Sequence, residues 1–206
     1  MQDDTSSPSI SGTVHEMPNR IANDQLRGGR KHLTESEIDK LIAAARKHNR
    51  HGARDATAIT IAFRHGLRSQ ELCDLEWTQV DFQRGTLHVN RVKGGSPATH
   101  YLNGTEMRAL RALRRENDKS RFVFVSERGD VVTTRWFRNM VAKTGEIAKM
   151  PFPIHPHMLR HACGFKFANE GRDTRSLQGY LGHRNIQSTT VYTALAADRF
   201  RGWEVE

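Results

Sequence analysis

Apolar residues recur every three or four positions along most of this chain, and that spacing constrains the fold more than any other feature. In residues 33–48 the apolar positions of this kind are Ile38, Leu41, Ile42 and Ala45. This interval places side chains on one face of an α-helix. Thr34 followed by Glu37 matches a capping box, which predicts where the helix begins. The same interval recurs in residues 55–66, 69–77, 105–117, 133–150 and 156–171, so most of the chain is predicted to be helical.

Glycine, proline and capping residues separate the predicted helices. Gly66 and Gly182 follow apolar runs and are predicted to end helices. Thr133 or Thr134 is expected to cap the helix of residues 133–150, and Pro156 suits the first position of the next. Two short helices are expected after Gly171, one ending at Gly182 and one containing Tyr192.

Residues 80–102 change to a period of two, which is typical of a strand. Leu87 and Val89 alternate with polar neighbours, and residues 94–97 form a Gly-Gly-Ser-Pro turn cluster. That cluster predicts a hairpin over residues 91–102, with Lys93 at its shoulder. Residues 121–132 suggest a further short strand and turn. The predicted fold class is therefore mainly α with a small antiparallel β-sheet (α+β).

The charge balance favours a polyanionic partner. The chain has 206 residues with 32 Lys plus Arg against 23 Asp plus Glu, a net charge of +9, and such an excess is typical of proteins that bind nucleic acid.

Cys73 and Cys163 lie far apart in apolar runs, so we expect reduced core thiols. No run of about 18 apolar residues suggests a membrane span, and the polar N-terminus does not resemble a signal peptide. A cytoplasmic protein with one core is expected.

Residues 1–31 contain few large apolar side chains and are expected to form a flexible arm. The ordered part is predicted to begin at residue 32.

The segment HPHMLRH places His157, Arg160 and His161 on one face of a predicted helix. An arginine can donate a planar fork of hydrogen bonds to a phosphate, and a histidine can donate or move a proton. A zinc site is a weaker alternative, because the catalytic zinc motif HExxH requires glutamate where Met158 stands. Ordinary surface polarity is the other alternative.

Three further motifs are individually weak. Arg68 and Glu71 in GLRSQEL could be a solvated ion pair, and Lys93 could be an ordinary turn lysine. The stretch LGHRNIQSTTVYTAL carries His183 and Tyr192. A tyrosine can attack phosphorus when a base or cations surround it, but a half-buried structural tyrosine fits the same pattern.

In this order, GLRxxEL, a hairpin lysine, HxLRH, LGH and a tyrosine nine residues later resemble the tyrosine site-specific recombinases, the phage integrase family. The resemblance spans about residues 33–198 and is strongest to the short fimbrial phase-variation recombinases, which invert a promoter-bearing DNA segment. It implies the catalytic-domain fold of that family, with an arm at 1–31, a catalytic domain at 32–198 and a tail at 199–206. The chain is therefore expected to lack the additional N-terminal domain that clamps DNA in many members.

The resemblance also implies the reaction. Tyr192 would attack the scissile phosphate, forming a 3′-phosphotyrosyl link and freeing a 5′-hydroxyl. Arg68 and Arg160 would hold the non-bridging oxygens as negative charge builds, and Lys93 would protonate the departing oxygen. Neither a metal nor a cofactor is implied.

The remaining site residues have supporting or secondary roles in this resemblance. His157 would be the acid/base partner of the tyrosine hydroxyl, and His183 would hydrogen-bond the phosphate. Glu71 would support Arg68, and His161 is expected to be structural.

Double-stranded DNA at specific sites is the expected partner, with a tetramer on two sites during synapsis and a monomer when free. The tail could dock on a neighbouring protomer through Phe200 and Trp203, or pack on its own domain. A basic helix face is expected either to follow the phosphate backbone or to be solvated; its members are Arg108, Arg111, Arg114 and Arg115. Accessory proteins that bend DNA and association with a bacterial nucleoid are also implied.

Other functions stay open at this point. The recombinase could integrate or excise DNA instead of inverting it, and the fold could belong to a catalytically silent DNA-binding regulator. A topoisomerase using the same tyrosine chemistry is a third alternative.

Overall fold

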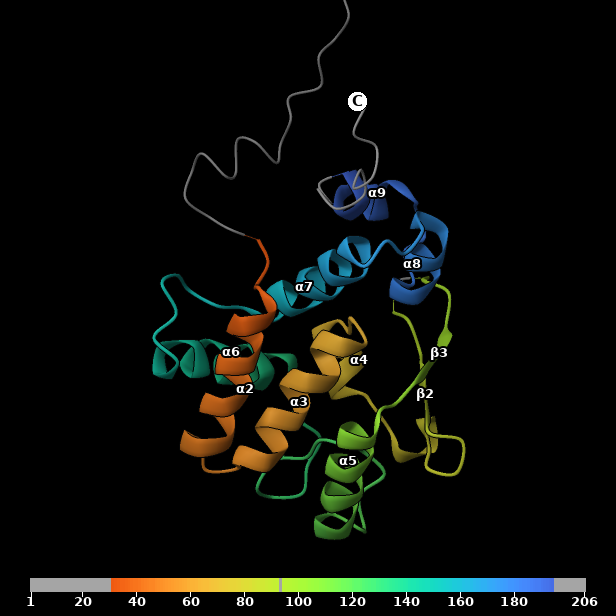
Figure 1. Cartoon of the computed structure of the whole chain (residues 1–206). Helices are drawn as coiled ribbons and strands as arrows, with labels where there is room; N and C mark the ends of the chain where they lie inside the picture. The colour runs from red at the N-terminus through yellow and green to blue at the C-terminus, as the bar shows by residue number, and fades with distance from the viewer. Residues whose placement is uncertain (1–30, 93, 195–206) are drawn as a thin grey trace, which may run out of the picture. The chain divides into compact units, whose positions relative to one another are not determined.

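The computed structural model describes residues 31–194 except Lys93 (Figure 1). The predicted arm up to residue 30, residue 93 and residues 195–206, with Phe200 and Trp203, lie outside the described residues. The elements in chain order are α2 Glu35–His48, α3 Gly52–Arg64, α4 Ser69–Cys73, the 3-10 turn η1 Trp77–Gln79, β1 Val80–Asp81, β2 Thr86–Val89, β3 Ala98–Tyr101, α5 Gly104–Glu116, α6 Thr134–Ile147, α7 Pro156–Asn169, α8 Thr174–Leu181 and α9 Gln187–Ala194. The mainly helical class with a small antiparallel sheet is confirmed.

Helix α3 is the central support of the helical part. It packs along α2 and also contacts α5 and α7. Its apolar residues Ala58, Ile59 and Ile61 are fully buried, because neighbouring helices cover it on several sides. In Figure 1, α5 lies below α3 whereas α7, α8 and α9 lie above it.

The local signals that bound the helices are confirmed at several ends. The Thr34 hydroxyl accepts from the Glu37 amide at 3.3 Å, and the Glu37 carboxylate accepts from the Thr34 amide at 2.8 Å. Thr133 is the cap of α6, accepting from the Trp136 amide at 3.1 Å. Gly66 and Gly182 have φ of 57° and 63°, a left-handed conformation that glycine adopts without strain.

The sheet is antiparallel with strand order β1-β2-β3. Leu87 pairs with His100 and Val89 with Ala98, and both apolar side chains are buried. The hairpin arms are β2 and β3, so the connection between them, residues 90–97, is longer than the predicted turn.

Two predicted elements differ in extent. The helix expected over 69–77 ends at Cys73, and a 3-10 turn follows at Trp77–Gln79. The strand expected within 121–132 is present only as the isolated bridges 76↔122 and 125↔131. The Val123 amide bonds to the Leu75 carbonyl whereas the Ser126 amide bonds to the Asp130 carbonyl, so amides three residues apart pair with different segments and no continuous ladder forms.

Cys73 and Cys163 are free and buried, as predicted, and burial raises the pKa of each thiol to about 12. Within residues 31–194, apart from Lys93, no helix is long and apolar enough to cross a membrane.

Candidate active site

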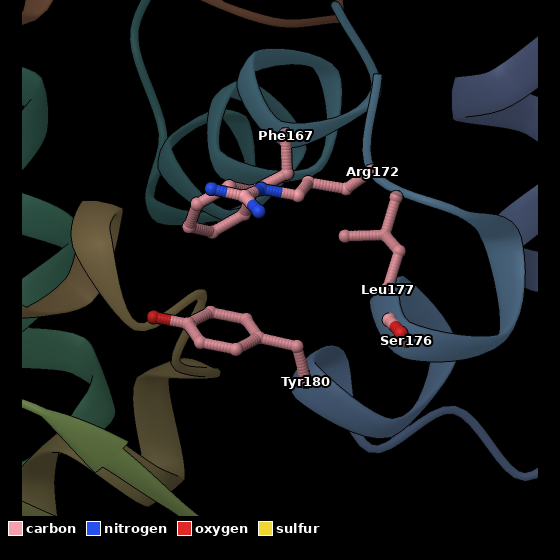
Figure 2. Close-up of a pocket in the computed structure, with 5 residues that line it drawn as sticks. All are labelled: Phe167, Arg172, Ser176, Leu177 and Tyr180. Atoms are coloured by element: carbon pink, nitrogen blue, oxygen red, sulfur yellow. The ribbon is translucent and has the colours of Figure 1, made fainter. Parts of the chain in front are cut away.

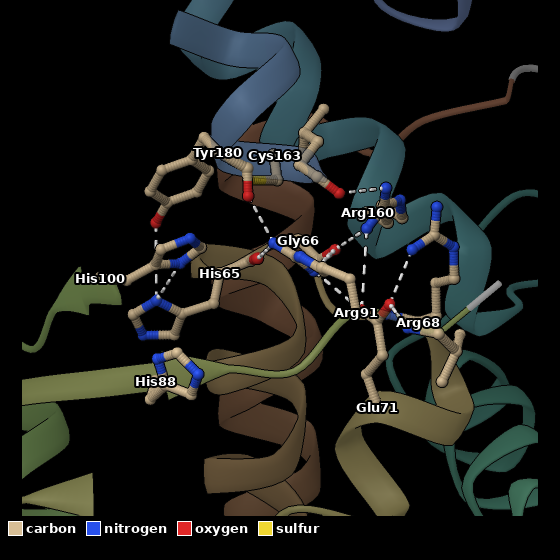
Figure 3. Close-up of polar contacts among 12 residues, drawn as sticks. His65, Gly66, Arg68, Glu71, His88, Arg91, His100, Arg160, Cys163 and Tyr180 are labelled. Carbon is tan, nitrogen blue, oxygen red and sulfur yellow. Dashed lines mark hydrogen bonds and ion pairs between the residues drawn. The ribbon is translucent and has the colours of Figure 1, made fainter. Parts of the chain in front are cut away.

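Arg160 joins three segments at one end of α3. It lies on α7, and its side chain is among the largest that are fully buried. One terminal nitrogen donates to the Gly66 carbonyl after α3, and the other donates to the Leu181 carbonyl of α8 at 2.7 Å (Figure 3). Burial, together with the nearby Arg68 and Arg91, lowers the pKa of Arg160 to about 10, so the guanidinium remains charged at neutral pH.

The Glu71 carboxylate lies beside the arginines of the site. Its carboxylate accepts from Arg68 through the guanidinium at 2.6 Å and through the backbone amide at 2.9 Å, and a nitrogen of Arg160 lies 3.9 Å away. Burial opposes ionisation of Glu71, but hydrogen bonds from Arg68 and Arg91 outweigh it and hold the pKa of this carboxyl below its usual value. The Arg68 side chain is still 25% exposed, so it can meet a ligand.

A surface pocket of about 250 Å³ brings Arg68 and His157 together. Its lining residues are Leu67, Arg68, Ser69, Pro156 and His157. Burial, together with the charge of Arg160, lowers the pKa of His157, so the ring is neutral at neutral pH. A guanidinium beside an imidazole suits an anion such as a phosphate.

Tyr192 on α9 is buried and its hydroxyl lies 3.0 Å from Nδ1 of His161. Burial raises the pKa of Tyr192 to about 12, and burial lowers the pKa of His161 to about 3. The tyrosine is therefore protonated at neutral pH, and the neutral His161 ring can accept its hydrogen bond. The His157 ring meets His161 edge-on, with centroids 4.4 Å apart. The structure thus pairs the hydroxyl with His161 and places His157 one ring further away.

His183 follows the left-handed Gly182 and faces Tyr192. Its Nδ1 lies 2.8 Å from the Thr189 hydroxyl, and its ring is nearly parallel to that of Tyr192, with centroids 6.2 Å apart. Burial lowers the pKa of His183 to about 4. Because Thr189 engages Nδ1, Nε2 is the nitrogen that could meet a phosphate.

Lys93 lies outside the described residues, but its hairpin reaches the site. The amide of the preceding residue, Val92, donates to Glu71 at 3.2 Å.

The basic face of α5 is remote from this cluster. Arg111 lies over the Phe82 ring at 5.6 Å and Arg114 over the Trp77 ring at 5.0 Å, so these side chains pack against the residues around β1. Arg108 and Arg115 are exposed on the same helix. Figure 1 places α5 away from α7 and α9.

Sequence reasoning missed Arg91, whose side chain is fully buried and bonds to Glu71 at 2.8 Å. The sequence does indicate this burial, because Leu87, Val89 and Arg91 are two residues apart, and alternate residues of a strand place their side chains on the same face.

It also missed Gly164 on α7. A Cβ on this residue would lie 2.7 Å from the Tyr192 ring, so glycine is required for the observed packing of that ring.

Replacing Gly164 with alanine is expected to push the Tyr192 ring out of its burial site. The pKa of Tyr192 should then fall from about 12 towards the usual value of about 10. Spectroscopic titration of the phenolate would measure this shift, and the signal would be assigned by its loss in Tyr192→Phe. Gly179→Ala is the matched control, because a Cβ there meets nothing within 4 Å. An unchanged titration in Gly164→Ala would contradict this packing.

Buried neutral histidines are expected to make the fold acid-sensitive. Burial lowers the pKa of His100 to about 3 from the ordinary 6.5, and His161 and His183 are also lowered, to about 3 and 4. The unfolded chain therefore binds more protons than the folded chain below pH 6.5. The free energy of unfolding should fall as the pH drops from about 6.5 towards 4, by up to about 1.4 kcal/mol per pH unit for each histidine.

Urea unfolding at a series of pH values would measure this dependence. His100→Phe should reduce the slope, because phenylalanine keeps the stacking on Tyr180 but does not titrate. His48→Gln changes an exposed histidine and serves as the control. Equal slopes in the wild type and His100→Phe would refute the contribution of His100.

A separate pocket of about 230 Å³ lies between α7 and α8 (Figure 2). It is lined by Phe167, Arg172, Ser176, Leu177 and Tyr180. None of the predicted site residues lines it, so it is distinct from the arginine cluster.

Comparison with known proteins gives a consistent result. The profile of the phage integrase family matches residues 31–199. The type 1 fimbriae regulatory protein FimB of Escherichia coli K12 is 40% identical over 181 residues, covering 85% of this chain and 90% of that protein. Tyrosine recombinase XerC of Oceanobacillus iheyensis is 33% identical, over 82% of this chain and 58% of that protein. The crystal structure of XerA recombinase superposes with a TM-score of 0.72 at 27% identity, covering 84% of this chain and 63% of that chain.

Proposed function

The chain belongs to the phage integrase family and is a tyrosine recombinase, and we propose that it uses Tyr192 to invert a DNA segment bounded by specific sites. The observation that carries the site assignment is the gathering of Arg68 and Arg160 at Glu71, next to the helix face that meets Tyr192. Similarity to FimB, a type 1 fimbriae regulatory protein, supports inversion that regulates a neighbouring gene. The proposed catalytic domain is residues 32–198.

In the proposed reaction the scissile phosphate lies in the pocket shared by Arg68 and His157. Arg68 and Arg160 donate to the non-bridging oxygens, where negative charge increases in the transition state. His183 donates a further hydrogen bond through Nε2. Arg68 is already partly exposed, whereas the Arg160 and Tyr192 side chains are buried, so the proposed reaction requires both to become accessible when DNA binds.

The Tyr192 oxygen then forms a bond to phosphorus while the bond from phosphorus to the 5′ oxygen breaks. Lys93 protonates the departing oxygen. The tyrosine proton passes to Nδ1 of His161, which lies 3.0 Å from the hydroxyl. The acid/base role proposed for His157 requires a rearrangement on DNA binding, because His157 meets only the ring of His161. A 5′-hydroxyl from the partner site attacks the phosphotyrosyl link and regenerates Tyr192. The phosphodiester bond energy is conserved, so no nucleotide cofactor is required.

Assembly follows from the same proposal. Four protomers would act on two DNA sites, with DNA-bending accessory proteins where the geometry demands them. The tail would dock through Phe200 and Trp203, and the basic face of α5 would follow the DNA backbone. A protein that acts on DNA in this way would be associated with the bacterial nucleoid.

A plasmid that carries the DNA flanking the gene would test the function, because the proposal expects inverted repeats in that DNA. Co-expression with the wild-type protein should give both orientations of the segment between the repeats, detected by amplification across each junction. Tyr192→Phe should give only the starting orientation. A fixed orientation with a covalent protein–DNA adduct would favour integration or excision. Binding without adduct or inversion would favour a silent regulator, and relaxation of plasmids that lack the repeats would favour a topoisomerase.

A further inference from the structure

Arg91 lies in the connection after β2, two residues before Lys93. Its guanidinium donates to Glu71 at 2.8 Å and to the Gly66 carbonyl at 3.3 Å through one nitrogen. The other terminal nitrogen donates to the His65 carbonyl at 3.2 Å and to the Tyr180 carbonyl (Figure 3). One buried group therefore bonds to the end of α3, to α4 and to α8.

The aliphatic stem of Arg91 is held between two glycines. A Cβ on Gly182 would lie 2.5 Å from the Arg91 Cγ, and a Cβ on Gly95 would lie 3.0 Å from the Arg91 Cβ. The Gly95 position also lies against the Gly182 carbonyl, where a Cβ would come within 2.5 Å of the oxygen. The hairpin tip and the turn before His183 therefore pack directly on Arg91 and on each other.

These contacts reach the segments that carry most of the proposed catalytic residues. Glu71 holds Arg68, and the Gly66 carbonyl that accepts from Arg91 also accepts from Arg160. Val92, whose amide bonds to Glu71, precedes Lys93 in the sequence, and His183 directly follows Gly182. A lysine at position 91 could keep the charge but not the planar fork that bonds to several acceptors at once.

We infer that Arg91 is a positioning residue for strand cleavage, which fixes the hairpin connection at Val92 and Gly95, the Glu71 carboxylate and the His183 turn in one arrangement. The inference rests on the proposed function. Displacement of reacting groups by about 1 Å can slow a reaction about 100-fold, so loss of this guanidinium should slow cleavage at saturating DNA, where binding is no longer limiting. A merely structural buried arginine would lower the stability of the protein without this effect.

Arg91→Met tests the inference, and Arg54→Met is its matched control. Arg54 is also largely buried, donating to Asp55 at 2.9 Å and to the Val125 carbonyl at 2.8 Å, and its guanidinium lies over the Trp136 ring at 4.8 Å. It contacts none of the proposed catalytic residues in these bonds. The rate of adduct formation would be measured at saturating nicked duplex containing the inverted-repeat site, at a temperature where both variants are folded.

We expect Arg91→Met to form the adduct about 100-fold more slowly than the wild type, and Arg54→Met to stay within about threefold of it. Arg91→Lys should be intermediate, and it replaces Arg91→Met if that variant does not fold. A rate for the Arg91 variants within about threefold of Arg54→Met would overturn the inference.

Amide hydrogen exchange without DNA provides a readout that does not depend on the reaction. The Val92 amide bonds to Glu71 and the His183 amide bonds to Gln178. Relative to amides of α2, both should exchange faster in the Arg91 variants and neither should do so in Arg54→Met. A slow variant with unchanged exchange at either amide would also refute positioning. If the wild type formed no adduct, the proposed function would fail. The exchange result would still decide whether Arg91 holds the Val92 and His183 segments in place.

Discussion

Replacing Tyr192 with phenylalanine is expected to abolish the covalent protein–DNA adduct while leaving DNA binding intact. The substitution removes only the oxygen that attacks phosphorus, and loss of a nucleophile slows reactions of this kind by more than about 10⁴-fold. The ring keeps its packing over Gly164 and its edge-to-face contact with Phe165, whose centroid is 5.2 Å away. The lost hydrogen bond to His161 should cost only about 1 kcal/mol of stability.

The adduct would be detected on nicked duplex carrying the recombination site, as a protein–DNA species that resists denaturing electrophoresis. Tyr101→Phe is the control, because Tyr101 is 86% exposed on β3 and is given no role in the reaction. An adduct that persisted in Tyr192→Phe would remove Tyr192 from the mechanism.

Replacing Arg160 with lysine is expected to impair both cleavage and folding. One lost donor to the phosphate should slow cleavage about 10²- to 10³-fold. The Gly66 and Leu181 carbonyls both accept from Arg160, and a single ammonium cannot replace a guanidinium fork at both. Because buried acceptors without partners are costly, the free energy of unfolding should fall by about 3 kcal/mol.

Arg68→Lys separates the two effects. Arg68 is partly exposed and bonds to the adjacent Glu71, so its replacement should slow cleavage by a similar factor with a smaller loss of stability. Urea unfolding and the adduct rate at saturating DNA would be measured on both variants. Equal losses of stability in Arg160→Lys and Arg68→Lys would contradict the proposal that the buried Arg160 stabilises the fold more than the partly exposed Arg68. A wild-type cleavage rate in either variant would contradict its contact with the phosphate.

Much of the fold was predictable because its signals are local. The capping box of Thr34 and Glu37 acts across three residues, and the apolar spacing of α2 and α5 fixes which face of each helix is buried. Extents were less predictable where distant segments compete for the backbone. The helix beginning at Ser69 ends early, and the Trp77 amide bonds instead to the Arg121 carbonyl.

The candidate site was likewise predictable only in part. The residue types and their order indicated a phosphate-binding and tyrosine-bearing site, and Arg68 with Glu71 formed a visible pair within one turn of helix. Spacing could not predict the partner of the Tyr192 hydroxyl, because His157 and His161 occupy the same helix face, and the family resemblance assigned that role to His157. Packing of the ring over Gly164 places the hydroxyl at His161.

The sequence by itself therefore determined the helical class, several helix ends and the candidate reactive side chains, since each depends on residues close together in the chain. Only the tertiary structure decided how those side chains are held. Arg91 bonds to carbonyls 25, 26 and 89 residues away, and its burial is tolerable because those acceptors surround it in the folded protein. No local pattern encodes such a contact, because it exists only after the hairpin, α4 and α8 have packed against the end of α3.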